Sequence, residues 1–414
     1  MKSKILSTAS IDFIKDSDAS ATELASLLNV SRRTINRVRD GEISEGYDTP
    51  EAKDLSDYYG SLTRKNQRLA DLNNNMRKQT RESARADNVV IELTKELTDV
   101  ISQNAFSVRS QLKTHKHDDS KPVGIIHLSD LHFGERVIGV NGNNYDLSIL
   151  AARLRKYCHK ATALFKAQGI TDVFIASTGD MINSDRRMDE IMSNANNRSK
   201  VLTCAVDMLQ QFIVDLNQNF NVTLASVCGN ESRIGEYIGW SDKSASENYD
   251  HTIHFVLECI FKDSPVNVLP MSHPLEQVVD VNGMNILLIH GHNKTATTAK
   301  AETEVAKIRS KYAVHGVNID YVIFGHIHAT YISDWFARGS STVGANGYSE
   351  NGLNLTSRAA QNCYIVNSDK SIDAIKIDLQ HYDIDFGYHV NPDVEEYKPS
   401  HGQSATVVIQ KVLI

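Results

Sequence analysis

The sequence predicts an α/β domain preceded by a small helical module and a helical arm. From about residue 122 onward, short β-rich apolar runs alternate with helical stretches, which is typical of α/β proteins. The preceding stretch is highly polar, and Gly60 is its only helix breaker after Pro50. We therefore expect four parts: residues 1–49 as the helical module, 50–113 as the arm, 114–122 as a linker, and 123–414 as the α/β domain.

Composition excludes several classes of protein. The chain has 414 residues, of which 41% are apolar, so it can form one large core and one or two small ones. It has no apolar run of eighteen residues, and its first residues, MKSKILSTASIDF, lack a secretory apolar stretch. Five widely spaced cysteines without a CxxC motif are typical of reduced thiols in a cytoplasmic protein. The net charge of −7 means that any contact with nucleic acid requires a local basic patch.

The N-terminal module has the spacing of a helix-turn-helix over residues 21–41, ATELASLLNVSRRTINRVRDG. Asn29 falls at the turn, where the left-handed conformation is tolerated, and Ser31 is a natural N-cap. Small Ala25 permits a close helix crossing. The side chains expected to reach phosphates and base edges of DNA are Arg32, Arg33, Asn36, Arg37 and Arg39. One such unit binds weakly, so we expect a homodimer; the alternative is a helical hairpin with a solvated basic face.

The arm carries Leu55, Leu62 and Leu69 at seven-residue spacing, which favours a coiled helix. Between residues 64 and 85, seven basic residues stand against two acidic ones. Two interpretations remain open: a solvated charged face, or an arm that tracks DNA or dimerises.

Five apolar runs in the last region end in residue types that bind metals. These residues are Asp130 and His132, Asp180, Asn230, His290 with His292, and His326 with His328. Because the carboxyl ends of strands converge in α/β sheets, we expect these side chains to cluster. Carboxylate, amide and imidazole together suit hard or borderline divalent ions, and two ions about 3.5–4 Å apart can clamp a phosphoryl group. Asp180 is the candidate for a bridging carboxylate.

The ordered motifs DxH, GD, GN, a later His and GHxH resemble the calcineurin-like metallophosphoesterase family over about residues 123 to 370. The resemblance implies a β-sandwich flanked by helices and two divalent ions, commonly manganese, with zinc, iron or magnesium as alternatives. It implies that one ion is held by Asp130, His132, Asp180 and His328. It implies that the other is held by Asp180, Asn230, His290 and His326.

Within that family, the added helical elements are closest in logic to the Mre11/SbcD-type nuclease branch. Those proteins place the catalytic domain first, whereas here the helical elements precede it. This reversed order leaves a partner ATPase unassigned.

Glu231, in VCGNESRIGE, occupies the position where most of the family has a histidine that protonates the leaving group. A carboxylate beside two dications stays ionised, so Glu231 should be a poor acid at neutral pH. Three alternatives remain open. In the first, Glu231 orients a metal-bound water while His292, His251 or His254 serves as the acid. In the second, the leaving group needs little protonation. The third is that the site binds metal and phosphate without turnover. Arg233 either steadies a substrate phosphate or pairs with a nearby glutamate. The candidate catalytic residues are thus Asp180, Glu231, His292 and Arg233.

Two polar segments are expected near the metal face. Residues 183–200, with Arg186, Arg187, Arg198 and Lys200, form either a substrate-contacting lid or a solvated helix. Residues 338–354 are rich in Gly, Ser and Asn, and we expect them to shape substrate access.

The leading functional prediction is a metal-dependent phosphodiesterase that cleaves DNA, a nuclease targeted by its N-terminal module. One alternative is a phosphatase or phosphodiesterase for a small phosphorylated molecule or a protein. The other is a non-catalytic DNA-binding protein.

Overall fold

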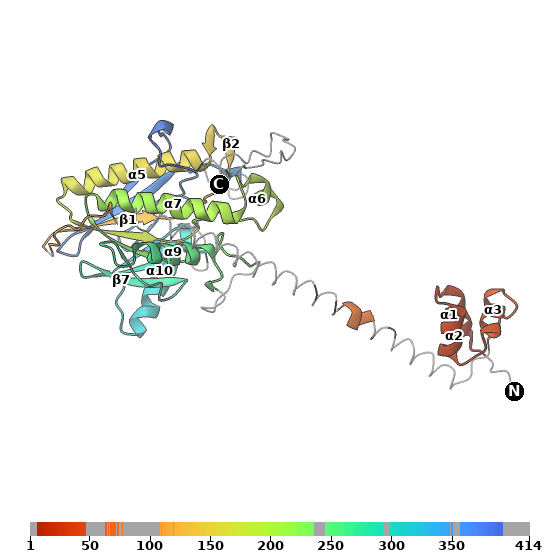
Figure 1. Ribbon diagram of the computed structural model, residues 1–414. Coiled ribbons are helices and arrows are strands. Elements are labelled where there is room, and N and C mark those ends of the chain that lie inside the picture. The colour runs from red at the N-terminus through yellow and green to blue at the C-terminus, as the bar shows by residue number, and fades with distance from the viewer. Residues whose placement is uncertain are drawn as a thin grey trace. The chain divides into compact units, whose positions relative to one another are not determined.

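The computed structural model describes residues 6–46, 63, 65, 67–71, 73, 77, 108, 110–118, 120–235, 245–292, 298–347, 349–350 and 357–391. The chain forms two compact units, 1–88 and 89–414 (Figure 1). Most of the arm expected over residues 50–113, with its heptad leucines and basic stretch, lies outside the described residues. No helix in the described ranges is both long enough and apolar enough to cross a membrane.

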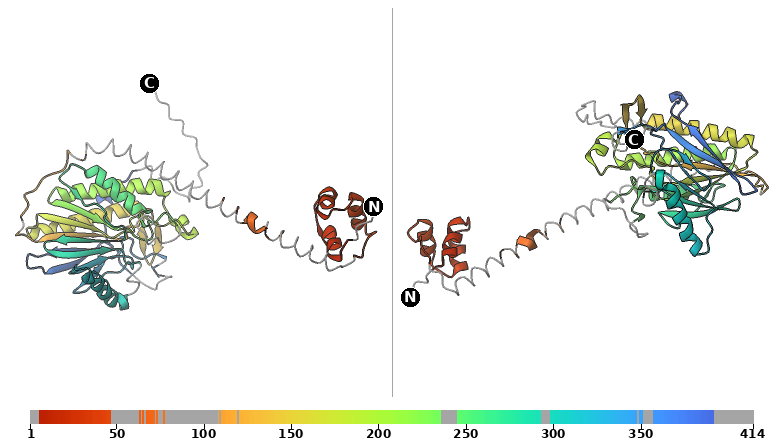
Figure 2. Two further views of the ribbon diagram at one scale, coloured as in Figure 1. Left: turned by 90° about the horizontal axis from the view of Figure 1, so that it is seen from below. Right: turned by 180° about the vertical axis from the view of Figure 1, so that it is seen from behind.

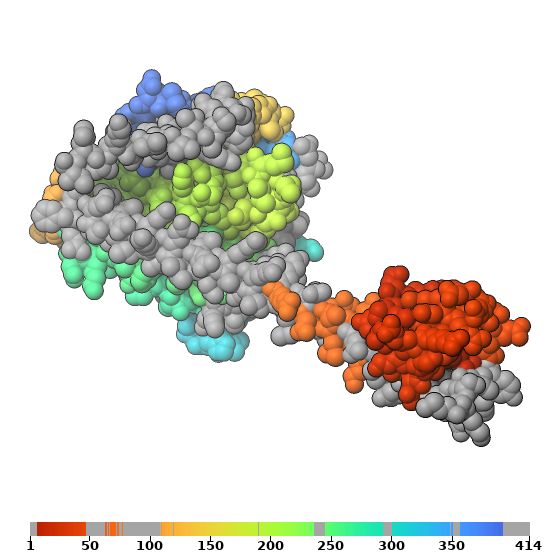
Figure 3. Space-filling view, turned by 45° about the vertical axis from the view of Figure 1, so that its right-hand side comes forward, coloured from red at the N-terminus to blue at the C-terminus, as the bar shows by residue number. Residues whose placement is uncertain are grey.

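Residues 6–46 of the first unit form the short helices α1 (Thr8–Asp16), α2 (Ala21–Leu28) and α3 (Arg32–Arg39). Figure 3 shows the surface of this part of the chain in red. Their core is formed by Leu6, Ile11, Ile14, Leu24, Ala25, Ile35 and Val38. The turn between α2 and α3 has the expected geometry, since Asn29 is left-handed with φ of 51°. The Ser31 side chain accepts a hydrogen bond from the Thr34 backbone N–H, as its N-cap position predicts.

Arg39 links α3 to the turn between α1 and α2. Its Nη2 atom donates to the carbonyl oxygens of Ser17 at 2.7 Å and Ala19 at 2.6 Å. These carbonyls follow the end of α1, where the backbone lacks helical partners, so they capture the guanidinium. Arg39 thus has a structural role within this unit, and Arg32, Arg33 and Arg39 are all exposed on α3.

The second unit is built on two sheets. The larger has the strand order β13-β12-β1-β4-β5-β6. In chain order its strands are β1 (Val123–Leu128), β4 (Asp172–Ser177), β5 (Asn221–Ser226), β6 (Asn267–Val268), β12 (Ala360–Val366) and β13 (Ile372–Asp378). Strands β1, β4, β5 and β6 run parallel, whereas β12 and β13 are antiparallel to their neighbours.

The smaller sheet has the order β10-β11-β9-β8-β7. Its strands are β7 (Glu276–Val281), β8 (Met284–Ile289), β9 (Tyr321–Phe324), β10 (Tyr331–Ile332) and β11 (Phe336–Arg338). Strands β8 and β9 are parallel. A separate hairpin is formed by β2 (Val137–Val140) and β3 (Asn143–Tyr145).

The two sheets pack face to face, and helices cover both outer faces (Figure 2). Ile125 of β1 and Ile323 of β9 share the core between the sheets. Helices α5 (Leu147–Ala167), α7 (Arg198–Asn217) and α9 (Tyr249–Phe261) cover the larger sheet, and α10 (Thr298–Val314) covers the smaller. Two further short helices in the described ranges are α6 (Met188–Ser193) and η2 (Ile384–Phe386). The predicted fold, a β-sandwich flanked by helices, is confirmed.

The central strands end level with one another. Leu128 of β1 pairs with Ser177 of β4, and Ser177 pairs with Ser226 of β5. These strands are covered on both faces, which explains their nearly unbroken apolar sequences. The residues that follow them therefore emerge side by side at one edge of the sandwich.

The expected linker is partly docked on the second unit. Lys113 N–H donates to Asn217 Oδ1 at 2.7 Å, and His115 N–H donates to Asn221 Oδ1 at 3.1 Å. This contact lies at the opposite end of the strands, because Asn217 ends α7 and Asn221 begins β5.

Candidate metal centre

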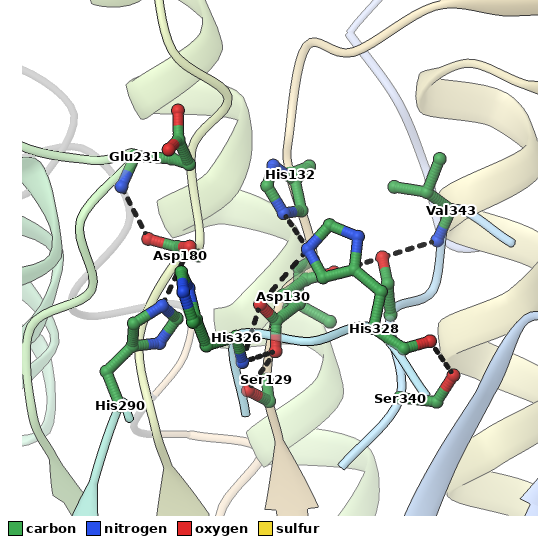
Figure 4. A network of polar contacts seen from close by, with 12 residues as sticks. Ser129, Asp130, His132, Asp180, Glu231, His290, His326, His328, Ser340 and Val343 are labelled. Carbon is green, nitrogen blue, oxygen red and sulfur yellow. Dashed lines mark hydrogen bonds and ion pairs between the residues drawn. The ribbon is translucent and has the colours of Figure 1, made fainter. Parts of the chain in front are cut away.

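Two groups of side chains that could hold metal ions lie at the carboxyl edge of the sandwich. One contains Asp130, His132 and His328, and the other contains Asp180, His290 and His326. Within each group, the possible ligand atoms lie within 4.8 Å of one another. In Figure 4, His132 and His328 lie beside Asp130, while His290 and His326 lie beside Asp180.

The first group has the chemistry of a cation site. The Nε2 atoms of His132 and His328 face each other at 3.0 Å, and His328 Nε2 lies 3.3 Å from Asp130 Oδ1. The other ring nitrogen of His132 is 3.2 Å from Asn183 Oδ1, where its N–H can donate. That hydrogen bond leaves the His132 Nε2 lone pair for an ion, which is the usual arrangement of a metal-binding histidine.

The second group follows the same rule. His290 Nδ1–H donates to the Thr178 carbonyl at 2.7 Å. His290 Nε2 lies 2.9 Å from Asp180 Oδ2 and 3.0 Å from Asn230 Oδ1. Burial disfavours a charged His290, but the Asp180 carboxylate outweighs burial and raises the pKa of His290 to about 10. The Asp180 carboxylate therefore favours positive charge beside His290 Nε2.

Asp130 and Asp180 both stay ionised. Burial opposes charge on each, yet neighbouring imidazoles dominate: His328 lowers the pKa of Asp130 to about 2, and His290 lowers the pKa of Asp180. Two buried carboxylates surrounded by four histidines form a donor set that fits hard or borderline divalent ions.

Backbone conformation is unusual at these positions. Positive φ angles occur at Asp130 (51°), His132 (46°), Asp180 (54°), His326 (74°) and His328 (58°). Non-glycine residues rarely adopt this conformation, and it costs of order 1–3 kcal/mol each where strain is stored. Its concentration on candidate ligands indicates that the fold is built to aim these side chains.

Close backbone approach demands glycine between the ligands. A Cβ on Gly229 would collide with Asp180 Oδ1, and a Cβ on Gly325 would collide with Ser129 Oγ and Asp130 Oδ2. Gly179 packs in the same way against the backbone of Gly229. The glycines of the GD, GN and GH motifs thus let the ends of β1, β4, β5 and β9 approach closely.

Asp250, which was not identified from the sequence, ties two of these strand ends together. Its buried carboxylate accepts hydrogen bonds from the backbone N–H groups of Asp180 at 2.9 Å, Met181 at 3.0 Å and Gly229 at 2.8 Å. Burial and the neighbouring Asp180 carboxylate raise the pKa of Asp250. The only signal in the sequence was a helix start, since Asn248 caps α9 two residues earlier.

A second unpredicted feature is a buried chain of hydrogen bonds that ends on Asp130. Burial lowers the pKa of His127 to about 3, so this residue is neutral. Tyr364 and Thr178 contact its two ring nitrogens at 3.1 and 2.9 Å. Thr178 Oγ1 then donates to Ser129 Oγ at 2.7 Å, and Ser129 Oγ donates to Asp130 Oδ2. This chain fixes the rotamer of Asp130.

Glu231 contributes its backbone to the centre. Its N–H donates to Asp180 Oδ1 at 2.7 Å, and Figure 4 shows its side chain turned away from Asp180. Arg233, the other uncertain residue in this loop, donates from Nη1 to the Asn230 carbonyl at 2.5 Å.

The three histidines considered as proton donors differ in position. His292 lies beside the second group, with its ring centroid 5.4 Å from that of His290 and 6.2 Å from that of His326. Burial, and then His290, lower the pKa of His292 to about 3. His254 is buried in the core, where its Nδ1 contacts Ser226 Oγ at 3.0 Å. His251 precedes it on α9 and is half-buried.

The segment expected over residues 338–354 is only partly described. Its first part, residues 338–346, is buried, and positions 348 and 351–354 lie outside the described residues. Ser341 Oγ donates to the Asp130 carbonyl at 2.7 Å, and Thr342 N–H donates to the same oxygen at 3.3 Å. The hydroxyl groups are buried because carbonyls of the metal-binding loop accept their hydrogen bonds.

No family model and no curated protein matches the sequence. Solved structures that match include Vps29 complexed with Zn²⁺ from Entamoeba histolytica, at 13% identity and a TM-score of 0.27, covering 62% of this chain and 99% of that one. A predicted phosphoesterase from Streptococcus pneumoniae TIGR4 matches at 12% identity and a TM-score of 0.25, covering 62% and 97%. The 5′-nucleotidase from Candida albicans SC5314 matches at 11% identity and a TM-score of 0.32, covering 69% and 58%. These TM-scores are low, and the function proposed below rests on the geometry of the site.

Proposed function

We propose that this chain is a metal-dependent phosphodiesterase of the calcineurin-like metallophosphoesterase type that cleaves DNA. The observation that carries the proposal is the pair of three-residue groups at one edge of the sandwich, each combining a buried carboxylate with two imidazoles. Two such groups side by side suit two divalent ions and a phosphoryl group between them.

In this proposal, Asp130, His132 and His328 hold one ion, Asn230, His290 and His326 hold the other, and Asp180 is shared. A bound pair of divalent ions would supply Lewis-acid stabilisation of the phosphoryl oxygens and an activated water at neutral pH. The chain's own part is to aim the ligands. Asn183 and the Thr178 carbonyl accept the outer N–H groups of His132 and His290, so both Nε2 atoms face inward.

DNA as the substrate is supported by the N-terminal unit. The helix α3 begins with exposed Arg32 and Arg33 and carries exposed Asn36, residue types that contact phosphates and bases. The added helical elements are closest in logic to the Mre11/SbcD-type nucleases, although here they precede the α/β domain. A homodimer would place two weak DNA-binding units on one substrate.

The test is hydrolysis of a chromogenic phosphodiester and of linear duplex and single-stranded DNA, with Mn²⁺ or with a chelator. We expect cleavage that a chelator abolishes and that is lost in Asp180→Asn. The control is Asp320→Asn, the same substitution directly before β9 of the smaller sheet, and it should keep the activity. Arg32→Ala with Arg33→Ala should reduce DNA cleavage and leave chromogenic turnover intact. Chromogenic turnover without DNA cleavage by the wild type would favour a small phosphorylated substrate. Absence of both reactions would contradict the proposal and favour DNA binding without catalysis.

A further inference from the structure

Glu231 makes two side-chain contacts that its position in the motif does not explain. Its Oε1 accepts a hydrogen bond from Asn230 Nδ2. Its Oε2 forms an ion pair with Arg186 Nη2 at 3.0 Å. The carboxylate is therefore held between the amide of a candidate metal ligand and a guanidinium.

Two arginines also grip the backbone of this loop. Arg186 Nη1 donates to the Glu231 carbonyl at 2.9 Å, and Arg198 Nη2 donates to the same oxygen at 3.1 Å. Arg198 is buried, and its Nε lies 3.0 Å from Asp185 Oδ1. The basic residues expected to form a substrate lid are thus partly used to fasten residues 183–186 to the loop after β5.

These contacts specify the orientation of the Asn230 amide. Its Nδ2 is engaged by Glu231, so its Oδ1 faces His290 Nε2 at 3.0 Å. A flipped amide would set its oxygen against the Glu231 carboxylate, where two acceptors repel each other, and would direct N–H groups toward the ion. The carboxylate thus selects the one amide orientation that can ligate a cation.

We propose that Glu231 is a positioning residue for the second metal ion, acting through the Asn230 amide and itself held by Arg186. It does not protonate the leaving group, because both of its oxygens accept hydrogen bonds. The inference rests on the proposed function and deepens it, since it assigns a role to the residue that replaces the expected histidine.

Metal affinity tests the inference without relying on turnover. Calorimetric titration of the full-length protein with Mn²⁺ should give two sites, one of which weakens roughly 10–100-fold in Glu231→Ala, the usual effect of losing an outer-shell partner. Glu231→Gln should lose less, because the glutamine oxygen can still accept from Asn230. Glu276→Ala is the matched control: Glu276 is ion-paired to Lys311 at 2.9 Å, and its side chain is 18% exposed against 21% for Glu231. Its affinities should stay unchanged.

Kinetics separate positioning from proton donation. For a positioning residue, Glu231→Ala should slow hydrolysis of p-nitrophenyl and alkyl diesters alike, and saturating Mn²⁺ should restore much of both rates. A proton donor would behave differently: Glu231→Gln would slow only the alkyl diester, which needs a proton on its leaving group, and metal affinity would not change. That second pattern would overturn the inference.

The outcomes also distinguish this inference from the proposed function. If both Mn²⁺ sites have the same affinities in Glu231→Ala as in the wild type, the positioning role alone is overturned. Wild-type protein that binds no Mn²⁺ would overturn the proposed function and this inference together. If Glu231→Ala does not fold, judged by circular dichroism, Arg186→Met carries the test. It removes the guanidinium that holds the carboxylate but leaves Asn230 and Glu231 in place, and it should weaken the same Mn²⁺ site.

Discussion

Asp250 offers the sharpest test of how the metal centre is assembled. Its buried carboxylate joins the turns after β4 and β5 through three backbone hydrogen bonds. Replacing Asp250 by Ala leaves the N–H groups of Asp180, Met181 and Gly229 without their acceptor. We expect both a loss of stability and a loosened ligand arrangement.

The magnitude follows from those contacts. A hydrogen bond to a charged group contributes about 1.5–3 kcal/mol, and three that share one carboxylate are not additive. Water entering the space left by the side chain recovers part of the loss. We therefore expect Asp250→Ala to lower the free energy of unfolding by about 4 kcal/mol, and Asp250→Asn, which keeps one acceptor oxygen, by about 2 kcal/mol.

The assay is urea unfolding followed by tryptophan fluorescence, because Trp240 and Trp335 both belong to the second unit. Asp320→Ala serves as the control, since half-buried Asp320 accepts one backbone hydrogen bond, from Asn285 at 2.8 Å. It should cost about 1 kcal/mol. A loss no larger for Asp250→Ala than for this control would refute the assembly role of Asp250.

Three further predictions address the ligands and the N-terminal unit. Gly229→Ala should weaken Mn²⁺ binding roughly ten-fold or more, because its Cβ would collide with Asp180 Oδ1. Gly235→Ala, whose Cβ meets nothing within 4 Å among the residues that the structure describes, should leave the titrations unchanged. The pKa of His290 in the folded protein is raised to about 10, so in metal-free protein the stabilisation from protonated His290 is complete below about pH 6.5. This stabilisation should fall as the pH rises toward 10. A midpoint of urea unfolding that increases over this range would contradict the prediction. Arg39→Ala should speed amide hydrogen exchange in α1–α3 about five-fold, which corresponds to a loss of about 1 kcal/mol in the free energy of unfolding of this unit. If exchange is unchanged and DNA binding becomes less dependent on salt, Arg39 contacts a phosphate instead.

Much of the fold could be predicted because the central strands are buried on both faces. Such strands are continuous apolar runs, and the run from Val123 to Leu128 coincides with β1. Asp130, Asp180 and His290 each follow directly after one of these runs. Because the carboxyl ends of such strands meet at one edge, the clustering of these residues could be predicted. The turn at Asn29 was predictable for a similarly local reason, its tolerance of positive φ.

The supporting residues could not be predicted, because their partners are distant in the sequence. Asp250 contacts Asp180 across 70 positions, and Arg186 contacts Glu231 across 45. Composition alone did not reveal that the hydroxyl groups of Ser341 and Thr342 donate to buried carbonyls of Asp130 and Leu131. The carboxylate of Glu231 directly after Gly229 and Asn230 was visible in the sequence, but its partners were not.

The number of metal ions bound per chain tests the central claim most directly. Calorimetric titration of metal-free protein with Mn²⁺ should give two ions per chain for the wild type. Both should weaken in Asp180→Asn, because this residue is proposed to be shared, whereas His328→Ala should weaken only one. A wild type that binds a single ion, or none, would contradict a dinuclear centre.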